Sequence, residues 1–212
     1  MAYSRGTSTN IIVGAAALFV ADTALTPGTL EAFVNGESFR ETLSDSPDYT
    51  NVGYTMNGLE MQFQPDFGEV QVDQILDVAK LYKQGMQVSL ATAFAEATLE
   101  NLLLSLAANA DDLSGNKLSS GGRTLNLSAG DIGECPVERA IVAVGPGTGD
   151  CADSPYIERV YTAYRALSIE NVTVSAKRDE ASMFEVNFRL LPEDASGSYG
   201  KIVDRTWASN SI

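Results

Sequence analysis

Most of the fold information in this chain lies in one stretch, residues 53–107, which reads GYTMNGLEMQFQPDFGEVQVDQILDVAKLYKQGMQVSLATAFAEATLENLLLSLA. Its first part alternates apolar and polar residues, the pattern of a strand with one buried and one exposed face. We predict a hairpin over residues 58–74 with a turn at Phe67-Gly68, and a longer strand over 81–91. The polar face of the hairpin consists of Glu60, Gln62, Gln64, Gln71 and Asp73.

The same stretch ends in a predicted amphipathic helix at about residues 96–108. Its apolar residues recur at the i, i+3, i+4 and i+7 spacing of one helix face, which predicts that this face is buried against a sheet. Glu96 and Glu100 lie near the helix start, where the helix dipole favours acidic side chains. The predicted core positions are Leu99, Leu102, Leu103 and Leu106.

The remaining segments that form strands lie at residues 11–21, 30–34, 140–144, 156–176 and 183–191. Long polar connections separate them at about 35–51, 109–134 and 145–155, and the tail after Pro192 is polar. We therefore expect a mainly β fold of one domain, residues 1–212: a two-sheet β-sandwich or half-barrel with one flanking helix and long loops. Such a fold leaves open sheet edges, for which another copy of the chain is the usual partner.

The composition argues against nucleic-acid affinity and against most enzyme chemistry. The chain of 212 residues has a net charge of −14 and contains no histidine. Histidine is the commonest general base and the commonest metal ligand, and no recognisable motif replaces it. We therefore predict no enzyme activity, no catalytic, cofactor-binding or metal-binding residues, and no cofactor. Between Glu41 and Ala79 eight acids occur without one Lys or Arg, so this surface is expected to repel phosphate groups.

The two cysteines and the N-terminal apolar run indicate where in the cell the protein is expected. Cys135 and Cys151 lie in a region rich in Gly and Pro, where free thiols of a protein made in the cytoplasm are the favoured interpretation and a disulfide is the alternative. The run at 11–21 is short for a membrane span and is better explained as a buried strand. We expect no membrane partner.

The block around residues 50–108 resembles the major tail tube proteins of long-tailed bacteriophages. In that family an aromatic-x-Pro-Asp step precedes a Val-Asp-Gln step, a long strand and a Leu-rich helix. The residues that carry the resemblance are Gly53-Tyr54-Thr55, Gly58, Phe63-Gln64-Pro65-Asp66, Val72-Asp73-Gln74 and the run Ala95 to Leu102. Residues 109–156 show no match to the family pattern.

The resemblance implies a virion structural protein that self-assembles into six-membered rings stacked into a tail tube. Inner strands of all copies would join around a lumen through which DNA passes without specific binding, and other tail proteins would cap the tube ends. The polar hairpin face (Glu60, Gln62, Gln64, Gln71 and Asp73) is then expected to line the lumen. The loop at 35–51 would bridge successive rings through Glu37, Arg40, Glu41, Asp45 and Asp48. The location would be the virion tail, after synthesis in the host cytoplasm.

Three other readings of the sequence stay open. Another virion component of related fold, such as a tail terminator, a baseplate hub or a capsid decoration protein, fits the same pattern. A carbohydrate-binding β-sandwich would need an exposed aromatic platform, and Trp207 and the tyrosines are scattered. A hydrolase built on two carboxylates among Glu60, Asp66, Glu69 and Asp73 would need one of them to stay protonated.

Overall fold

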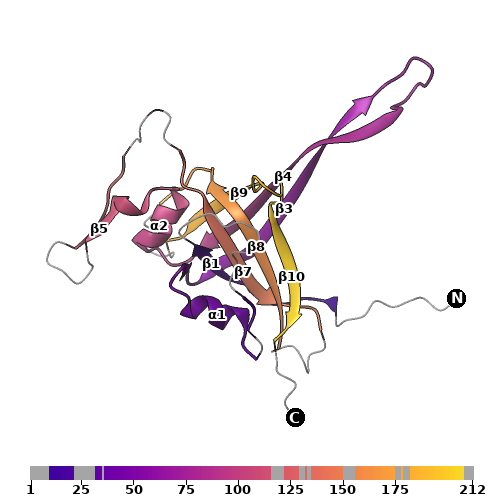
Figure 1. Cartoon of the computed structure of the whole chain (residues 1–212). Coiled ribbons are helices and arrows are strands. Elements are labelled where there is room, and N and C mark those ends of the chain that lie inside the picture. Colours follow the sequence, from indigo (N-terminus) through magenta and orange to yellow (C-terminus); the bar gives the residue numbers. More distant parts are fainter. Residues whose placement is uncertain are drawn as a thin grey trace, which may run out of the picture.

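The computed structural model describes residues 10–21, 32–34, 36–115, 122–128, 132, 135–149, 156–174, 178 and 182–207. The fold is mainly β, as expected: of the described residues, 49% are in strands and 12% in helices (Figure 1). The strands are β1 Ala17–Ala21, β2 Tyr49–Asn51, β3 Thr55–Val70, β4 Lys80–Phe94, β5 Leu113–Gly115, β6 Arg123–Leu125, β7 Arg139–Pro146, β8 Ile157–Ser168, β9 Phe184–Leu191 and β10 Gly200–Thr206. The helices are α1 Phe39–Asp45 and α2 Leu99–Ser105, with a short 3-10 turn, η2, at Ala110–Asp112.

Eight of these strands form one antiparallel sheet that forks at β8. The order is β2-β1-β7-β8-β9-β4-β3, and β10 also pairs with β8. The first half of β8 pairs with β10, from Ile157↔Thr206 to Ala163↔Gly200. Its last residues pair with β9 instead, from Arg165↔Leu191 to Ser168↔Phe188. The sheet therefore has two limbs, β2-β1-β7 and β9-β4-β3, joined through β8, and it is not closed.

The two limbs face one another across the main core. Leu18 and Ile141 come from one limb, and Val88, Leu90 and Phe188 come from the other, and all of them belong to one buried cluster. Alternation along β9 puts Phe184, Val186, Phe188 and Leu190 into this core while the intervening residues face away. This is the period-2 burial that the sequence of residues 183–191 predicts.

A second core lies on the opposite face of β1 and β7, under helix α1. Phe19 of β1 and Val142 of β7 pack there against Phe39 and Leu43 of α1. Strands covered on both faces read as continuous apolar runs, which explains the uninterrupted apolar sequence of both strands. Residues 35–51 are therefore not one loop, as expected from their polarity, because they contain α1 and β2. The Ser38 hydroxyl caps α1 by accepting from the Arg40 backbone N–H.

Strands β3 and β4 form a hairpin that projects far from the body of the molecule (Figure 1). They pair from Thr55↔Phe94 to Val70↔Lys80, so the connection lies at residues 71–79. The expected turn at Phe67-Gly68 was wrong, because the chain continues there as a strand with a register shift after Asp66. Tyr82 covers Gly68, since a Cβ there would lie 2.5 Å from the Tyr82 ring carbon Cζ. We call residues 63–87 of this hairpin the arm.

Helix α2 packs on the main core but is shorter than predicted. Leu103 is buried, whereas Leu99 and Leu102 are half-buried. Leu106 is 42% exposed, so its expected burial was wrong: the helix ends at Ser105 and Ala107, at φ 52, turns the chain away. Leu104, which is outside the predicted stripe, belongs to the main core instead.

The expected long connections contain short elements, and one strand was not expected. The range 109–134 holds η2 and the two-stranded sheet β5–β6, and β7 extends to Pro146 at the start of the range 145–155. Strand β10 lies in the polar tail after Pro192, for which no strand was predicted, and residues 32–34 of the expected strand 30–34 are not in a strand. Cys135 is exposed, whereas Cys151 lies outside the described residues.

Candidate interaction surfaces

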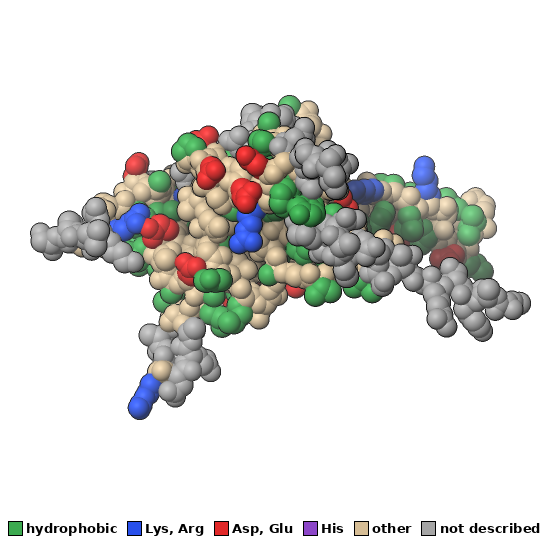
Figure 2. All heavy atoms as spheres, turned by 90° about the horizontal axis from the view of Figure 1, so that it is seen from below, with side chains coloured by type: hydrophobic (Ala, Val, Ile, Leu, Met, Phe, Trp, Pro, Cys, Tyr) green, Lys and Arg blue, Asp and Glu red, His purple; other side chains and the backbone are tan. Residues whose placement is uncertain are grey.

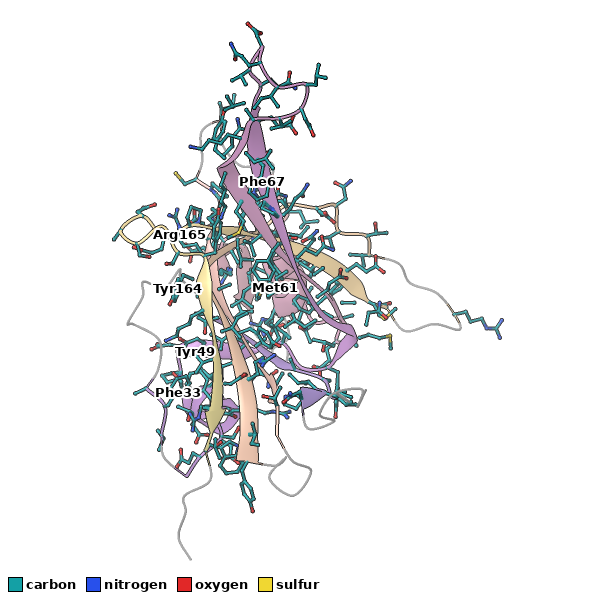
Figure 3. The ribbon with its side chains drawn as sticks, turned by 90° about the vertical axis from the view of Figure 1, so that its right-hand side faces the viewer. Phe33, Tyr49, Met61, Phe67, Tyr164 and Arg165 are labelled. Atoms are coloured by element: carbon teal, nitrogen blue, oxygen red, sulfur yellow. The ribbon has the colours of Figure 1, made fainter. Side chains whose placement is uncertain are left out.

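The arm carries large apolar side chains that nothing in the described chain covers. Figure 2 shows apolar side chains along the arm on the right, and Figure 3 shows Phe67 on the arm with Met61 at its foot. A projecting two-stranded ribbon has little core of its own, so such side chains indicate an interaction surface. The exposed apolar residues on the arm are Phe63, Phe67, Val70, Val72, Ile75, Leu76, Leu81 and Tyr82.

The register explains how part of this surface arises. Met61 pairs with Leu90 and Phe63 with Val88, so these side chains share the side of the ribbon that faces the main core. Further out, the same side of β3 continues with Phe67, which pairs with Lys83. On β3, apolar side chains therefore continue along one side from Met61 at the core through Phe63 to Phe67 on the outer arm, with Lys83 of β4 beside Phe67, and only the inner end of this face is covered.

A groove lies at the foot of the arm, where β10 diverges from β9. Its volume is about 600 Å³. The Tyr199 hydroxyl donates to the Met86 carbonyl oxygen at 2.6 Å and ties the β10 side of the groove to the β4 side. Lys83 lies at this groove, and its Nζ contacts the Met86 sulfur at 3.8 Å. The apolar lining consists of Met61, Phe63, Met86, Val88, Leu190 and Ile202.

The polar face of the hairpin is only partly where it was expected. Glu60, Gln62 and Gln64 share one exposed side of β3, and the Gln62 amide donates to Glu60 at 2.8 Å. The other two expected members, Gln71 and Asp73, lie in the 71–79 connection and not on this strand face. The misplaced turn is the cause, since it had folded residues 70–74 back beside 58–64.

Neighbouring strands widen this polar face into a sheet surface. Gln62 pairs with Ser89 of β4, which pairs in turn with Arg189 of β9, and Glu60 pairs with Ala91, which pairs with Asn187. Glu185 lies on the same side of β9 and is exposed. We call this surface the polar sheet face; it consists of Glu60, Gln62, Gln64, Gln87, Ser89, Ala91, Glu185, Asn187 and Arg189.

The residues expected to bridge rings form an exposed, mostly acidic rim on and around α1. Glu37, Arg40, Glu41, Asp45 and Asp48 are all exposed. A buried network holds this helix against the sheet. The Glu158 carboxylate accepts from the Phe39 backbone N–H at 2.8 Å and from the Ser38 hydroxyl at 2.7 Å. Arg205 pairs with Glu158 at 3.3 Å, and its Nη2 donates to the Glu37 carbonyl at 2.8 Å.

The fold leaves strand edges open. Among the strands that the structure describes, β3, of 16 residues, pairs only with β4, and β10 pairs only with β8. Pro65 lies within β3, a position that suits an edge strand because proline has no backbone N–H to donate. Unpaired backbone groups along such an edge are a template for another strand.

Four arginines of the described chain pair with carboxylates: Arg123, Arg159, Arg165 and Arg205. Arg159 donates to Asp204, with Nη2–Oδ2 at 2.5 Å, and this hydrogen bond lowers the pKa of Asp204 and raises that of Arg159. The hydrogen bonds that Arg165 donates to Glu138 and to Asp194 raise the pKa of Arg165 above its ordinary value. Lys83 differs, because no carboxylate in the described part of the chain pairs with it.

Within the described residues no group of three His, Cys, Asp or Glu side chains could hold a metal ion. Among the helices of that part of the chain, none has both the length and the apolar character needed to cross a membrane.

The chain matches no protein-family model and no curated protein.

Sequence reasoning missed the groove and the anchoring of α1. The groove joins Tyr199 to Met86, residues 113 positions apart, and no local pattern marks such a contact. The helix does have a local signal, Ser38 with Glu41 three residues later, which is the spacing of a capping box.

Proposed function

We propose that this protein is a structural subunit that assembles with copies of itself into the tail tube of a bacteriophage. Copies would form six-membered rings, and the rings would stack around a channel for DNA. The residues that resemble the tail tube family lie just before and on β3, in the 71–79 connection, and from the end of β4 into the start of α2. The resemblance therefore concerns the arm and its junction with the body, the most unusual part of the molecule.

One observation carries the proposal: the subunit has far more interaction surface than a single copy uses. The arm exposes eight large apolar side chains, among them Phe63, Phe67 and Leu76, and one edge of β3, a strand of 16 residues, has no partner strand in the described part of the chain. A specific protein interface of standard size buries about 800 Å² on each partner, and clustered apolar side chains form the core of such interfaces. Self-assembly accounts for both features at once.

The polar sheet face suits a channel wall for DNA. Glu60 and Glu185 are exposed carboxylates on this face, and Arg189 is its one basic side chain among the described residues. The whole chain carries a net charge of −14. A wall of amides and carboxylates repels phosphate and offers little counterion release, so DNA slides past without binding.

The role is proposed to be structural, without catalysis and without a cofactor. The chain contains no histidine, so a Ser-His or Cys-His pair cannot be built. Glu60, Asp66, Glu69 and Asp73 are exposed, which removes the apolar shielding that a proton-donating carboxyl group needs.

Electron microscopy of the purified protein tests the proposal. The protein is concentrated, alone and with seeds from its own virion, and is examined by negative stain and by light scattering after gel filtration. Stacked rings with a central hole are expected. A monomeric mass at every concentration, together with seeds that fail to elongate, would contradict it. Single rings that never stack would favour a tail terminator, and closed trimers a capsid decoration protein.

A further inference from the structure

The outer end of the arm is an apolar knob surrounded by acids. Ile75 is 54% exposed and Leu76 is fully exposed in the 71–79 connection. Asp73 and Asp77 flank them, and the segment contains no Lys or Arg. Two large aliphatic side chains at the far end of a projecting ribbon cost solvation energy unless something covers them.

No described part of the same copy covers the knob. Within the described chain β3 pairs only with β4, and the knob lies at the far end of that ribbon from the body (Figure 1). The cover must come from another molecule. Because the apolar face of the arm continues inward to Phe63 and Met61, the partner surface is expected to be apolar as well.

The groove at the foot of the arm has matching properties. Its volume of about 600 Å³ is ample for two branched aliphatic side chains. Ile202 is 52% exposed and Phe63 55% exposed on its walls, so both would lose water when the groove is filled. Lys83, which pairs with no carboxylate among the described residues, brings a cation to this groove on a chain of net charge −14. That cation complements the acids of the knob.

We propose that Ile75 and Leu76 of one copy insert into the groove of a second copy, with Asp73 and Asp77 close to its Lys83. The inference rests on the proposed self-assembly and names the contact within it. Knob and groove are different surfaces, so each copy offers both, and the contact is head-to-tail. A head-to-tail contact continues from copy to copy until the geometry closes a ring or extends a filament.

Cross-linking between two distinguishable copies tests the contact directly. Both carry Cys135→Ser and Cys151→Ser; one also carries Leu76→Cys and the other Ile202→Cys. After assembly of the mixture and mild oxidation, a disulfide-linked dimer that contains one copy of each kind is expected. Neither copy alone should cross-link to a comparable extent, because a disulfide needs Cα atoms about 4.4 to 6.8 Å apart.

Substitutions test the same contact without cysteines. Leu76→Asp should raise the concentration needed for assembly at least tenfold and leave the circular dichroism spectrum unchanged. The matched control is Leu127→Asp, since Leu127 is 79% exposed and lies outside the arm and the groove. Lys83→Glu should weaken assembly, and adding Asp73→Lys and Asp77→Lys to it should restore assembly.

The outcomes separate this inference from the proposed function. If the Leu76→Asp variant assembles at the wild-type concentration, or if the assembled mixture of the two cysteine variants gives no mixed cross-link, the knob–groove contact is wrong and self-assembly stands. If the wild-type protein does not assemble even with seeds, both proposals are wrong.

Discussion

Asn101 connects the start of α2 to the segment that precedes β3. Its side-chain amide donates to the Val52 carbonyl at 2.9 Å and to the Glu96 carbonyl at 2.8 Å, and Asn101 is 5% exposed. Glu96 completes the junction by accepting from the Tyr54 backbone N–H at 2.9 Å. Gly53 and Glu96, two residues of the family pattern, therefore lie in contact: a Cβ on Gly53 would overlap the Glu96 carboxylate.

Asn101→Ala should lower the free energy of unfolding by about 1 to 3 kcal/mol, because it leaves two carbonyl oxygens without their donor. Urea denaturation followed by circular dichroism measures the change. Asn126→Ala is the matched control, since that residue is exposed, and it should change stability by less than about 0.5 kcal/mol. Equal effects of the two variants would show that the amide does not hold the junction.

Glu193 gives the turn before β10 a dependence on pH. Its carboxylate accepts from the backbone N–H groups of Ala195 and Ser196, and these hydrogen bonds lower the pKa of Glu193 below its ordinary value. A lowered folded-state pKa means that the stabilisation is present above the unfolded-state pKa and is lost as pH falls through the folded-state value. The stability difference between the wild-type protein and Glu193→Gln should therefore be largest near neutral pH and shrink below about pH 4. A difference that is constant between pH 7 and pH 3 would contradict this account.

At the scale of elements, α1 stabilises the sheet more than its length suggests. Phe39 and Leu43 are fully buried and cover Phe19 and Val142. Phe39→Ala should cost about 3 to 5 kcal/mol, whereas the adjacent exposed substitution Arg40→Ala should cost less than about 0.5 kcal/mol. Denaturant midpoints measured on both variants check this. A small cost for Phe39→Ala would mean that the second core is not closed by this helix.

The exposed rim of α1 can be tested without harming its buried face. Glu41→Lys with Asp45→Lys reverses two exposed charges and should leave the denaturation midpoint within about 0.5 kcal/mol of the wild type. If the rim bridges rings, stacking should fail while single rings still form, as seen by electron microscopy. If this variant forms normal tubes, α1 does not bridge successive rings.

The elements that sequence could predict are those whose signal is local. Alternation over residues 58–64 and 183–191 fixed two strands because each has one buried face. Helix α1 was not predicted because its seven residues bury only two side chains. Strand β10 was not predicted because Lys201, Asp204 and Arg205 interrupt its alternation of apolar and polar residues. The Phe67-Gly68 step has the sequence of a turn. The features that accompany its extended conformation, the register shift and the Tyr82 ring, involve the partner strand, so the local sequence does not show them.

At the scale of the whole molecule, the sequence predicts only part of which residues share the polar sheet face. Glu60, Gln62 and Gln64 do share an exposed side of β3, since strand alternation determines that grouping. Their neighbours Glu185 and Arg189 come from β9, more than 100 residues later, and only the sheet order brings them together. Gln71 and Asp73 were assigned to this face by the misplaced turn.

The charge of the polar sheet face gives the last prediction. If this face lines a channel, Glu60→Lys with Glu185→Lys places two cations in each subunit where DNA passes, and the pattern repeats in every ring. Each cation that meets a phosphate releases counterions, so assembled tubes of this variant should bind duplex DNA with an affinity that falls steeply as salt increases. Co-sedimentation of tubes with DNA between about 50 and 200 mM salt measures this. The size-matched variant Glu60→Gln with Glu185→Gln adds no cation and should bind as weakly as the wild type. If the lysine variant forms tubes that bind DNA no better than the glutamine variant, the face lies away from the channel, and the acidity of this sheet only keeps the outer surface solvated.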